Sequence, residues 1–242
     1  MLKLDPQKIL FTGGSGLLGR AIQAILPEAD FPSSQDFDVT NLTQMEKYLQ
    51  RRELKILGHL AAFTAVAKCE EDPLPALETN IIGTANIVKL CQKFGLKLFY
   101  VSTDYVFRGD HGNYRETAEV LPINKYAWSK LGGECAVRLY ANSVIIRTSL
   151  GATVFPYAKA FSDQFTSRES APKIAQKIIK LLTKDFKGVI HLGGKRQTVL
   201  EYAKALEPTK KIGKFSIKEV SFPVPHDTSL NTAKYQKLFG KA

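Results

Sequence analysis

The feature that most constrains this fold is a glycine-rich turn that follows a short apolar run. Residues 8–12 read as a strand and residues 20–26 as an amphipathic helix, so the turn joins a strand to a helix. It fits two spacings, Gly13-x-x-Gly16-x-x-Gly19 and Gly14-x-Gly16-x-x-Gly19. Glycines permit a tight turn and let backbone N–H groups approach a pyrophosphate, which the start of the helix also attracts. The pattern predicts dinucleotide binding by Gly13, Ser15, Gly16, Leu17, Leu18 and Gly19.

Predicted strands and helices alternate along most of the chain. Strands are expected at 29–31, 54–60, 96–101 and 143–147, and helices at 43–51, 75–94 and 126–140. This alternation is typical of an α/β fold, so we predict a Rossmann-type doubly wound parallel sheet. Residues 1–150 are assigned to this dinucleotide-binding domain. Residues 151–242 are assigned to a small, shortened C-terminal lobe that binds substrate, with predicted helices at 171–182 and 200–206 and strands at 188–192 and 215–221; strand 188–192 is a candidate to return to the Rossmann sheet.

The residues that would bind the adenosine ribose are not fixed by spacing. An acid is expected about 20 residues after the glycines, and Asp30, Asp36 and Asp38 all lie in that range. No Arg or Lys lies between Pro27 and Asp38, although Ser33, Ser34 or Arg20 can serve a 2′-phosphate. Asp38 and Val39 are taken as cofactor contacts, and the choice between NAD(H) and NADP(H) stays open.

Small and polar residues follow the next two predicted strands. Ala61, Ala62 and Phe63 come after the strand at 54–60, where small side chains let a cofactor pass close by. Asn80 is a polar position within the helix at 75–94, and it is assigned either to the cofactor or to a backbone group. Ser102 to Phe107 follow the strand at 96–101, so they lie at the sheet edge where α/β proteins bind ligands.

Tyr126 and Lys130 are four residues apart on a predicted helix, so their side chains share one face. A chain of this composition contains about one Tyr-x-x-x-Lys by chance, so the pair gains its weight from its neighbours. Tyr126 is the candidate proton donor to a ketone that accepts a hydride, with Thr103 (or Ser102) bonding the carbonyl oxygen. Lys130 and an oxidised nicotinamide are expected to lower the phenol pKa from about 10 towards 7.

Composition narrows the class of protein. The 34 Lys and Arg exceed the 23 Asp and Glu, and the net charge of +11 favours an anionic ligand. No basic block indicates nucleic-acid binding, and no apolar run reaches the roughly 20 residues of a membrane span. Three widely spaced cysteines fit neither a disulfide framework nor a zinc site, so we expect no metal and a cytoplasmic location.

These motifs together resemble the dTDP-4-dehydrorhamnose reductase family of extended short-chain dehydrogenase/reductases. The resemblance rests on the glycine turn, His59-Leu-Ala-Ala, Ser102-Thr-Asp-Tyr-Val-Phe107 and Tyr126-x-x-x-Lys130, with matching segments almost end to end. It implies NADP(H) or NAD(H) and reduction of the 4-keto group of a nucleotide-activated 6-deoxy sugar, as in dTDP-L-rhamnose synthesis. Thr103, Tyr126 and Lys130 would be catalytic, the cofactor would also touch Asn80, Ser102, Tyr126 and Lys130, and substrate would touch Asp104, Tyr105, Val106, Phe107 and Arg147.

The resemblance also bears on competing functions. Tyr105 stands where sugar-nucleotide dehydratases usually have Glu, which disfavours dehydration. Three positions depart from the family pattern on the substrate side, namely Ala67 for Asp, Leu150 for an aromatic and Val224 for arginine, and the stretch between Arg147 and Gly188 is short. Two alternatives therefore stay open: a cofactor-binding regulatory subunit like the beta subunit of methionine adenosyltransferase, and an epimerase holding NAD tightly. Related reductases often dimerise, so a homodimer is also considered.

Overall fold

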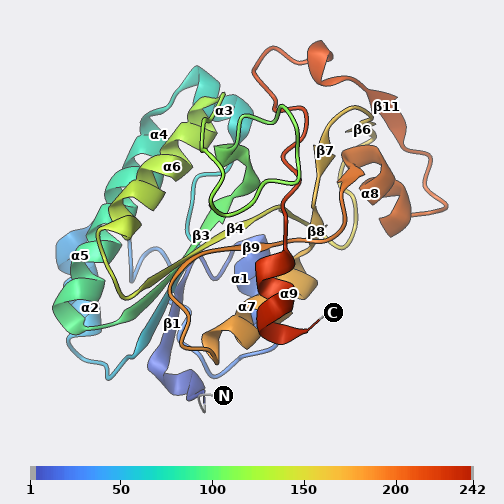
Figure 1. Ribbon diagram of the computed structural model, residues 1–242. Coiled ribbons are helices and arrows are strands. Elements are labelled where there is room, and N and C mark those ends of the chain that lie inside the picture. Colours follow the sequence, from blue (N-terminus) through green and yellow to red (C-terminus); the bar gives the residue numbers. More distant parts are fainter. Residues whose placement is uncertain (1–3, 241–242) are drawn as a thin grey trace.

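The computed structural model describes residues 4–240 and is built around a parallel sheet of five strands (Figure 1). The strand order is β1-β2-β3-β4-β9, and each neighbouring pair is parallel. The strands span Ile9–Thr12 (β1), Ile56–His59 (β2), Lys97–Thr103 (β3), Ser143–Thr148 (β4) and Gly188–Leu192 (β9). Pairing of β9 with β4 confirms that strand 188–192 returns to the Rossmann sheet.

The expected strand at 29–31 is present only as an edge segment. Asp30 forms a single parallel bridge with Leu10. Its N–H donates to the Ile9 carbonyl and its carbonyl accepts from the Phe11 N–H, each at 2.8 Å. Pro32 has no N–H to continue this ladder, so the pairing ends after one residue.

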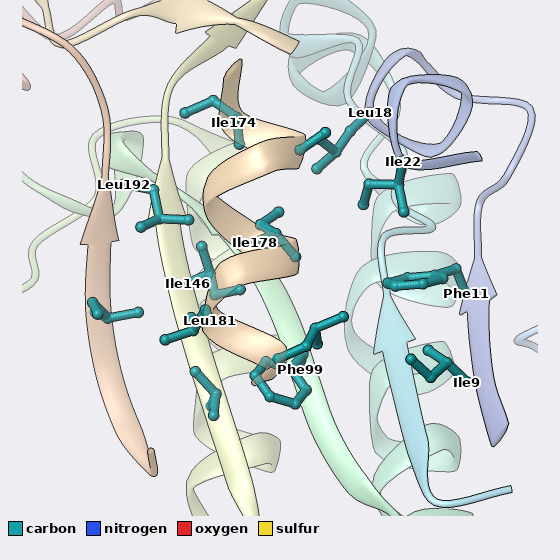
Figure 2. Close-up of a cluster of buried hydrophobic side chains, with 14 of the residues drawn as sticks. Ile9, Phe11, Leu18, Ile22, Phe99, Ile146, Ile174, Ile178, Leu181 and Leu192 are labelled. Atoms are coloured by element: carbon teal, nitrogen blue, oxygen red, sulfur yellow. The ribbon is translucent and has the colours of Figure 1, made fainter. Parts of the chain in front are cut away.

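Helices α1 (Leu17–Gln23), α7 (Ala171–Leu182) and α9 (Ala233–Phe239) cover one face of the sheet (Figure 1). Figure 2 shows how apolar side chains of α1 and α7 point at the strands. The helices contribute Leu18, Ile22, Ile174, Ile178 and Leu181, and the strands contribute Ile9, Phe11, Phe99, Ile146 and Leu192. Because α7, β9 and α9 all lie beyond residue 150, the C-terminal part of the chain contributes to the Rossmann layers as well as to the lobe.

Helices α2 (Leu42–Leu49), α5 (Thr84–Phe94) and α6 (Lys125–Arg138) cover the opposite face, which makes the sheet doubly wound as predicted. The single helix expected at 75–94 consists of α4 (Leu74–Ala76), a π-helical turn η2 (Leu77–Gly83) and α5. Gly95 ends α5 in the left-handed conformation, with a φ of 67°, as its sequence position predicts. Both faces are apolar, so most residues of the central strands are buried.

The lobe is assembled from short paired strands above the carboxyl ends of the sheet (Figure 1). Its pairs are β5 (Leu150–Gly151) with β8 (Glu169–Ser170), β6 (Lys159–Phe161) with β11 (Gly213–Phe215), and β7 (Phe165–Thr166) with β10 (Gln197–Thr198). Helix α8 (Val199–Leu206) packs on this lobe, and Thr198 and Glu201 form its capping box. The predicted strand 215–221 ends at Phe215, because Ser216 caps the 3₁₀ turn η4 (Ile217–Glu219).

Three short elements complete the described chain. They are the 3₁₀ turns η1 (Pro6–Lys8) and η3 (Asp104–Val106) and helix α3 (Val66–Glu71). No helix within residues 4–240 has the length and apolar character needed to cross a membrane.

Candidate active site

A cavity of about 1450 Å³ lies between the carboxyl ends of the central strands and the lobe. The strand ends contribute Thr12, Ser102, Thr103 and Thr148, and the lobe contributes residues 151–157 in part. This location is the edge where doubly wound sheets bind ligands. A single small-molecule site usually occupies roughly 300–1,000 Å³, so this cavity has room for more than one ligand.

The glycine turn forms one wall of this cavity. Gly13 has a φ of 71°, and a Cβ there would lie 2.7 Å from the Ala61 nitrogen. A Cβ on Gly19 would lie 2.3 Å from the Gly13 carbonyl oxygen. Only glycine fits these two positions, and the bare backbone therefore forms a cradle of the kind that admits a pyrophosphate.

A chain of hydrogen bonds holds the loop after β2 against this cradle. The Thr12 hydroxyl accepts from the Leu60 and Ala61 N–H groups at 3.1 Å and so donates to Nδ1 of His59 at 2.8 Å. His59 Nε2 lies 3.1 Å from the Thr84 hydroxyl, which itself donates to the Asn80 carbonyl. Burial lowers the pKa of His59 to about 3, so the ring is neutral and carries its proton on Nε2.

Asn80 links the same loop to the helix that carries Tyr126. Its Oδ1 accepts from the Phe63 N–H at 2.8 Å, and its Nδ2 donates to the Phe63 carbonyl at 3.0 Å and to the Ser129 hydroxyl at 2.8 Å. The Ser129 hydroxyl donates to the Tyr126 carbonyl at 2.7 Å. Asn80 is fully buried, and neither it nor Phe63 is among the residues that line the cavity. Direct cofactor contact by these two is not supported, since their hydrogen bonds are spent on each other.

Tyr126 and Lys130 reach the cavity from the first turns of α6. The Asn124 side chain caps that helix by accepting from the Ala127 N–H at 2.9 Å. Lys130 is 3% exposed, and its Nζ donates to the Val101 carbonyl at 2.8 Å and lies 4.3 Å from the Tyr100 ring centroid. Burial lowers the pKa of Lys130 to about 7, so the amine exchanges its proton near neutral pH.

The phenol of Tyr126 is partly buried beside Thr103, Asp104 and Tyr105. Its ring meets the Tyr105 ring edge-on, with centroids 6.3 Å apart. Burial raises the pKa of Tyr126 above its ordinary value, and the Asp104 charge acts in the same direction, while the Thr103 hydroxyl opposes them. Desolvation is the largest effect in this ligand-free arrangement, and the lowering expected from Lys130 together with an oxidised nicotinamide stays a prediction for the cofactor-loaded protein. Tyr126 holds its proton at neutral pH.

Asp104 lines the cavity, but its carboxylate is heavily bonded by the protein. Oδ2 accepts from Thr166 at 3.1 Å and from Thr228 at 2.6 Å, and Oδ1 accepts from Thr103 at 3.2 Å. Burial raises the pKa of Asp104 above its ordinary value, although these hydroxyls act against the rise. Tyr105, its neighbour, accepts from the Gln164 side chain at 2.6 Å.

Three of the predicted substrate contacts lie in the core instead. Arg147 has no exposed surface, and its Nε and Nη2 donate to the two oxygens of Glu134 at 2.9 and 2.7 Å. Val106 and Phe107 are also fully buried and pack with Tyr114. The assignment of substrate contact to Arg147, Val106 and Phe107 is corrected, because ion pairing and apolar packing take these side chains away from the cavity.

The acids near the expected ribose site are also occupied. Tyr48 donates to Asp30 at 2.9 Å, and Arg52 pairs with it at 3.0 Å, so Asp30 faces away from the cavity. Asp36 accepts from Ser33 at 2.6 Å. Asp38 lines the cavity, yet its Oδ1 accepts from the N–H and hydroxyl of Thr40. Arg20, Ser33 and Ser34 line the same corner.

The cavity thus brings together most of the residues predicted from sequence. Its lining includes Gly13, Ser15, Gly16, Leu17, Leu18, Gly19, Asp38, Val39, Ala61, Ala62, Ser102, Thr103, Asp104, Tyr105, Tyr126 and Lys130. It also includes Tyr157, Arg168 and Tyr202, which sequence reasoning missed because no motif surrounds them. Within residues 4–240, no group of three or more His, Cys, Asp or Glu side chains is placed to hold a metal ion.

Comparison with known proteins places this geometry in context. The family model described as the RmlD substrate binding domain matches residues 7–240. A dTDP-4-dehydrorhamnose reductase from Mycobacterium tuberculosis is 32% identical over 153 residues, covering 59% of this chain and 50% of that protein. Methionine adenosyltransferase 2 subunit beta from Pongo abelii is 27% identical over 181 residues, covering 70% and 52%. The chain therefore spans about half the length of these curated relatives.

The structural match covers more of the chain than these sequence matches do. The crystal structure of a dTDP-4-dehydrorhamnose reductase from Bacillus anthracis in complex with NADP has a TM-score of 0.86 to this chain. It is 26% identical, and the superposition covers 99% of this chain and 94% of that one. The predicted Rossmann-type fold is confirmed by the sheet topology and by this neighbour.

Proposed function

Because the chain belongs to the RmlD substrate binding domain family, we propose that it reduces the 4-keto group of a nucleotide-activated 6-deoxy sugar with NAD(P)H. The observation that carries the proposal is the convergence of Tyr126, Thr103 and Lys130 on one cavity that also contains the glycine cradle. A dTDP-linked sugar is the substrate we favour, since relatives named as dTDP-4-dehydrorhamnose reductases match the chain.

The chemistry assigned to the chain is positioning and proton donation. NAD(P)H supplies the hydride when it is bound. Reduction leaves negative charge on the carbonyl oxygen, and a positioned acid then contributes typically 10²–10⁴-fold to the rate. Tyr126 is that acid, because burial keeps its phenol protonated. Thr103 is 7% exposed and next to Tyr126, and its hydroxyl would turn from Asp104 Oδ1 to orient the same oxygen.

Lys130 supports Tyr126 from one turn further along α6. Its ammonium group has three donors, and one is used by the Val101 carbonyl at 2.8 Å. Because Lys130 lines the cavity, its other two donors are open to groups bound there. With a pKa of about 7, Lys130 can return a proton to the phenol after the transfer and recharge from solvent.

The ribose corner favours NADPH over NADH. An acid that accepts from the 2′-hydroxyl is the usual mark of NAD binding. Asp30 is paired with Arg52, and Oδ1 of Asp38 already accepts two hydrogen bonds from Thr40, so Oδ2 is the oxygen of Asp38 left for this role. Arg20 and Ser34 offer a positive charge and a hydroxyl donor to a 2′-phosphate at the same corner.

The test is oxidation of NADPH and NADH with dTDP-4-keto-6-deoxymannose generated in the assay. Tyr126→Phe should reduce kcat by about 10²–10⁴-fold, the contribution of a general acid, while the Kd for NADPH stays near the wild-type value. Tyr140→Phe is the matched control, because its hydroxyl donates to the Cys91 and Leu96 carbonyls away from the cavity.

Wild-type turnover in Tyr126→Phe would refute the assignment of the acid. Loss of turnover in both tyrosine variants would instead point to misfolding, which thermal unfolding of each variant detects. Turnover by the wild type with either cofactor also reports the cofactor preference directly.

A second candidate is a cofactor-binding regulatory subunit. The match to a methionine adenosyltransferase beta subunit over 70% of this chain favours it. It predicts saturable NADPH binding with no turnover of any 4-keto sugar nucleotide. Turnover that depends on Tyr126 would exclude this candidate.

A further inference from the structure

Arg168 differs from the other cations of the cavity. Among residues 4–240, the cavity is lined by three cationic side chains, Arg20, Lys130 and Arg168. Arg20 donates to the Ser15 carbonyl at the glycine turn, and Lys130 donates to the Val101 carbonyl. The Nε of Arg168 is buried and has no hydrogen-bond partner among the described residues. Its guanidinium is therefore the cation of this cavity with an unmet need for an acceptor.

The backbone of the lobe fixes the place of Arg168. Its carbonyl accepts from the Gln197 side chain at 3.1 Å, and the next residue, Glu169, pairs with Leu150 in the β5–β8 ladder. Its side chain passes over Gly151, where a Cβ would lie 3.3 Å from Cδ of Arg168 and 3.0 Å from the Tyr202 hydroxyl. The arginine stem thus lies beside Tyr202 on the lobe side of the cavity.

Asp104, a carboxylate near Arg168, is already hydrogen-bonded by other side chains. Asp104 accepts from the hydroxyls of Thr103, Thr166 and Thr228, and it makes no ion pair within 4.0 Å in the described chain. Arg168 is close enough that its charge acts to lower the pKa values of Asp104 and Tyr105. Burying a guanidinium without a hydrogen-bond acceptor costs free energy. An acceptor supplied by a ligand would offset that cost at Arg168.

We propose that Arg168 binds the diphosphate of the nucleotide-sugar substrate. The planar guanidinium donates in a fork that matches phosphate oxygens, and its charge fits an anion better than a sugar hydroxyl. The diphosphate would then lie on the lobe side of the cavity, beside Tyr202. The inference rests on the proposed function for its substrate class.

The test measures binding apart from catalysis. The probes are dTDP and inorganic pyrophosphate, titrated calorimetrically into the NADPH-loaded protein. Arg168→Gln should weaken dTDP binding by about 10- to 100-fold, the range expected for a lost charge-assisted contact. The same variant should raise KM for the sugar nucleotide more than it lowers kcat, and the Kd for NADPH should not change. Arg108→Gln is the control, since it removes one charge from an exposed arginine outside the cavity.

Arg168→Lys controls for misfolding. It keeps the positive charge and the aliphatic part of the side chain but loses the planar guanidinium that donates two parallel hydrogen bonds. It should unfold at the wild-type temperature and bind dTDP more weakly than wild type but more tightly than Arg168→Gln. Wild-type dTDP affinity in both variants would overturn the inference. A rise in the Kd for NADPH equal to that for dTDP would also overturn it, since Arg168 would then serve the cofactor.

The outcomes separate this inference from the proposed function. A protein that binds dTDP through Arg168 without reducing a sugar nucleotide would retain the inference and refute the reductase. If the Arg168→Gln variant turned over the sugar nucleotide normally, the reductase function would stand and the inference would be refuted.

Discussion

Replacing Arg147 tests whether this side chain belongs to the core or to the substrate site. Arg147 and Glu134 have no exposed side-chain surface and form two hydrogen bonds of 2.9 and 2.7 Å. Arg147→Met would leave the Glu134 carboxylate buried without its main partner. Breaking a buried pair in this way costs about 3–5 kcal/mol. The second, longer contact of Glu134 with Arg138, at 3.9 Å, compensates in part and favours the lower end of this range.

This cost is large enough to measure in two ways. In a domain of this size about 1 kcal/mol changes Tm by about 2–4 °C, so Arg147→Met should lower Tm by about 6–20 °C. Chemical denaturation should show the same loss as a lower midpoint with an unchanged slope. The double variant Arg147→Met/Glu134→Leu should recover most of the loss, because an apolar pair of similar volume avoids both desolvation penalties.

The kinetic readout decides between the two locations. If the pair is structural, the folded fraction of Arg147→Met/Glu134→Leu should keep the wild-type KM for the sugar nucleotide. A variant with wild-type Tm and a strongly raised KM would refute the core assignment and restore Arg147 to the substrate site.

Two further predictions concern Lys130 and Arg20. Burial lowers the pKa of Lys130 from 10.5 to about 7, so between those values the unfolded chain holds more protons and the stability of the ligand-free protein rises with pH. The rise in stability is at most about 1.4 kcal/mol per pH unit. Denaturation midpoints measured at pH 7, 8 and 9 should rise less in Lys130→Met than in the wild type. If stability rose equally with pH in both proteins, the lowered pKa of Lys130 would be contradicted. Arg20→Gln should raise KM for NADPH several-fold and leave KM for NADH unchanged, and steady-state kinetics with both cofactors would disprove the ribose-corner argument if both values moved together.

The parts of this fold that could be predicted from sequence are those that depend on local pattern. The glycine turn is largely local, because Gly13 has a positive φ and Gly19 contacts the backbone of Gly13 and Gly14. The strands at 96–101 and 188–192 are predicted from short apolar runs and the helix at 171–182 from its apolar period, and the structure has them at 97–103, 188–192 and 171–182. The spacing of Tyr126 and Lys130 defines one helix face, and the structure places both on the cavity.

The π-helical turn and the lobe could not be read in the same way. Residues 77–83 have an apolar pattern that suits an α-helix, and only tertiary contacts distinguish the wider turn. Asn80 lies in that turn, and its contacts with Phe63 and Ser129 come from segments 17 and 49 residues away. The lobe strands are two or three residues long, too short for a period to develop.

Charged residues show why a site cannot be read from residue type alone. Arg147 and Asp30 stood beside motifs and looked available, yet Glu134 and Arg52 form ion pairs with them in the fold. Arg168 stands beside no motif, and its Nε has no partner within the described chain. What makes a charge functional is the absence of an internal partner at a ligand cavity, and such partners come from anywhere in the chain. The sequence can therefore nominate charged residues, but the tertiary pairing decides which of them can bind substrate.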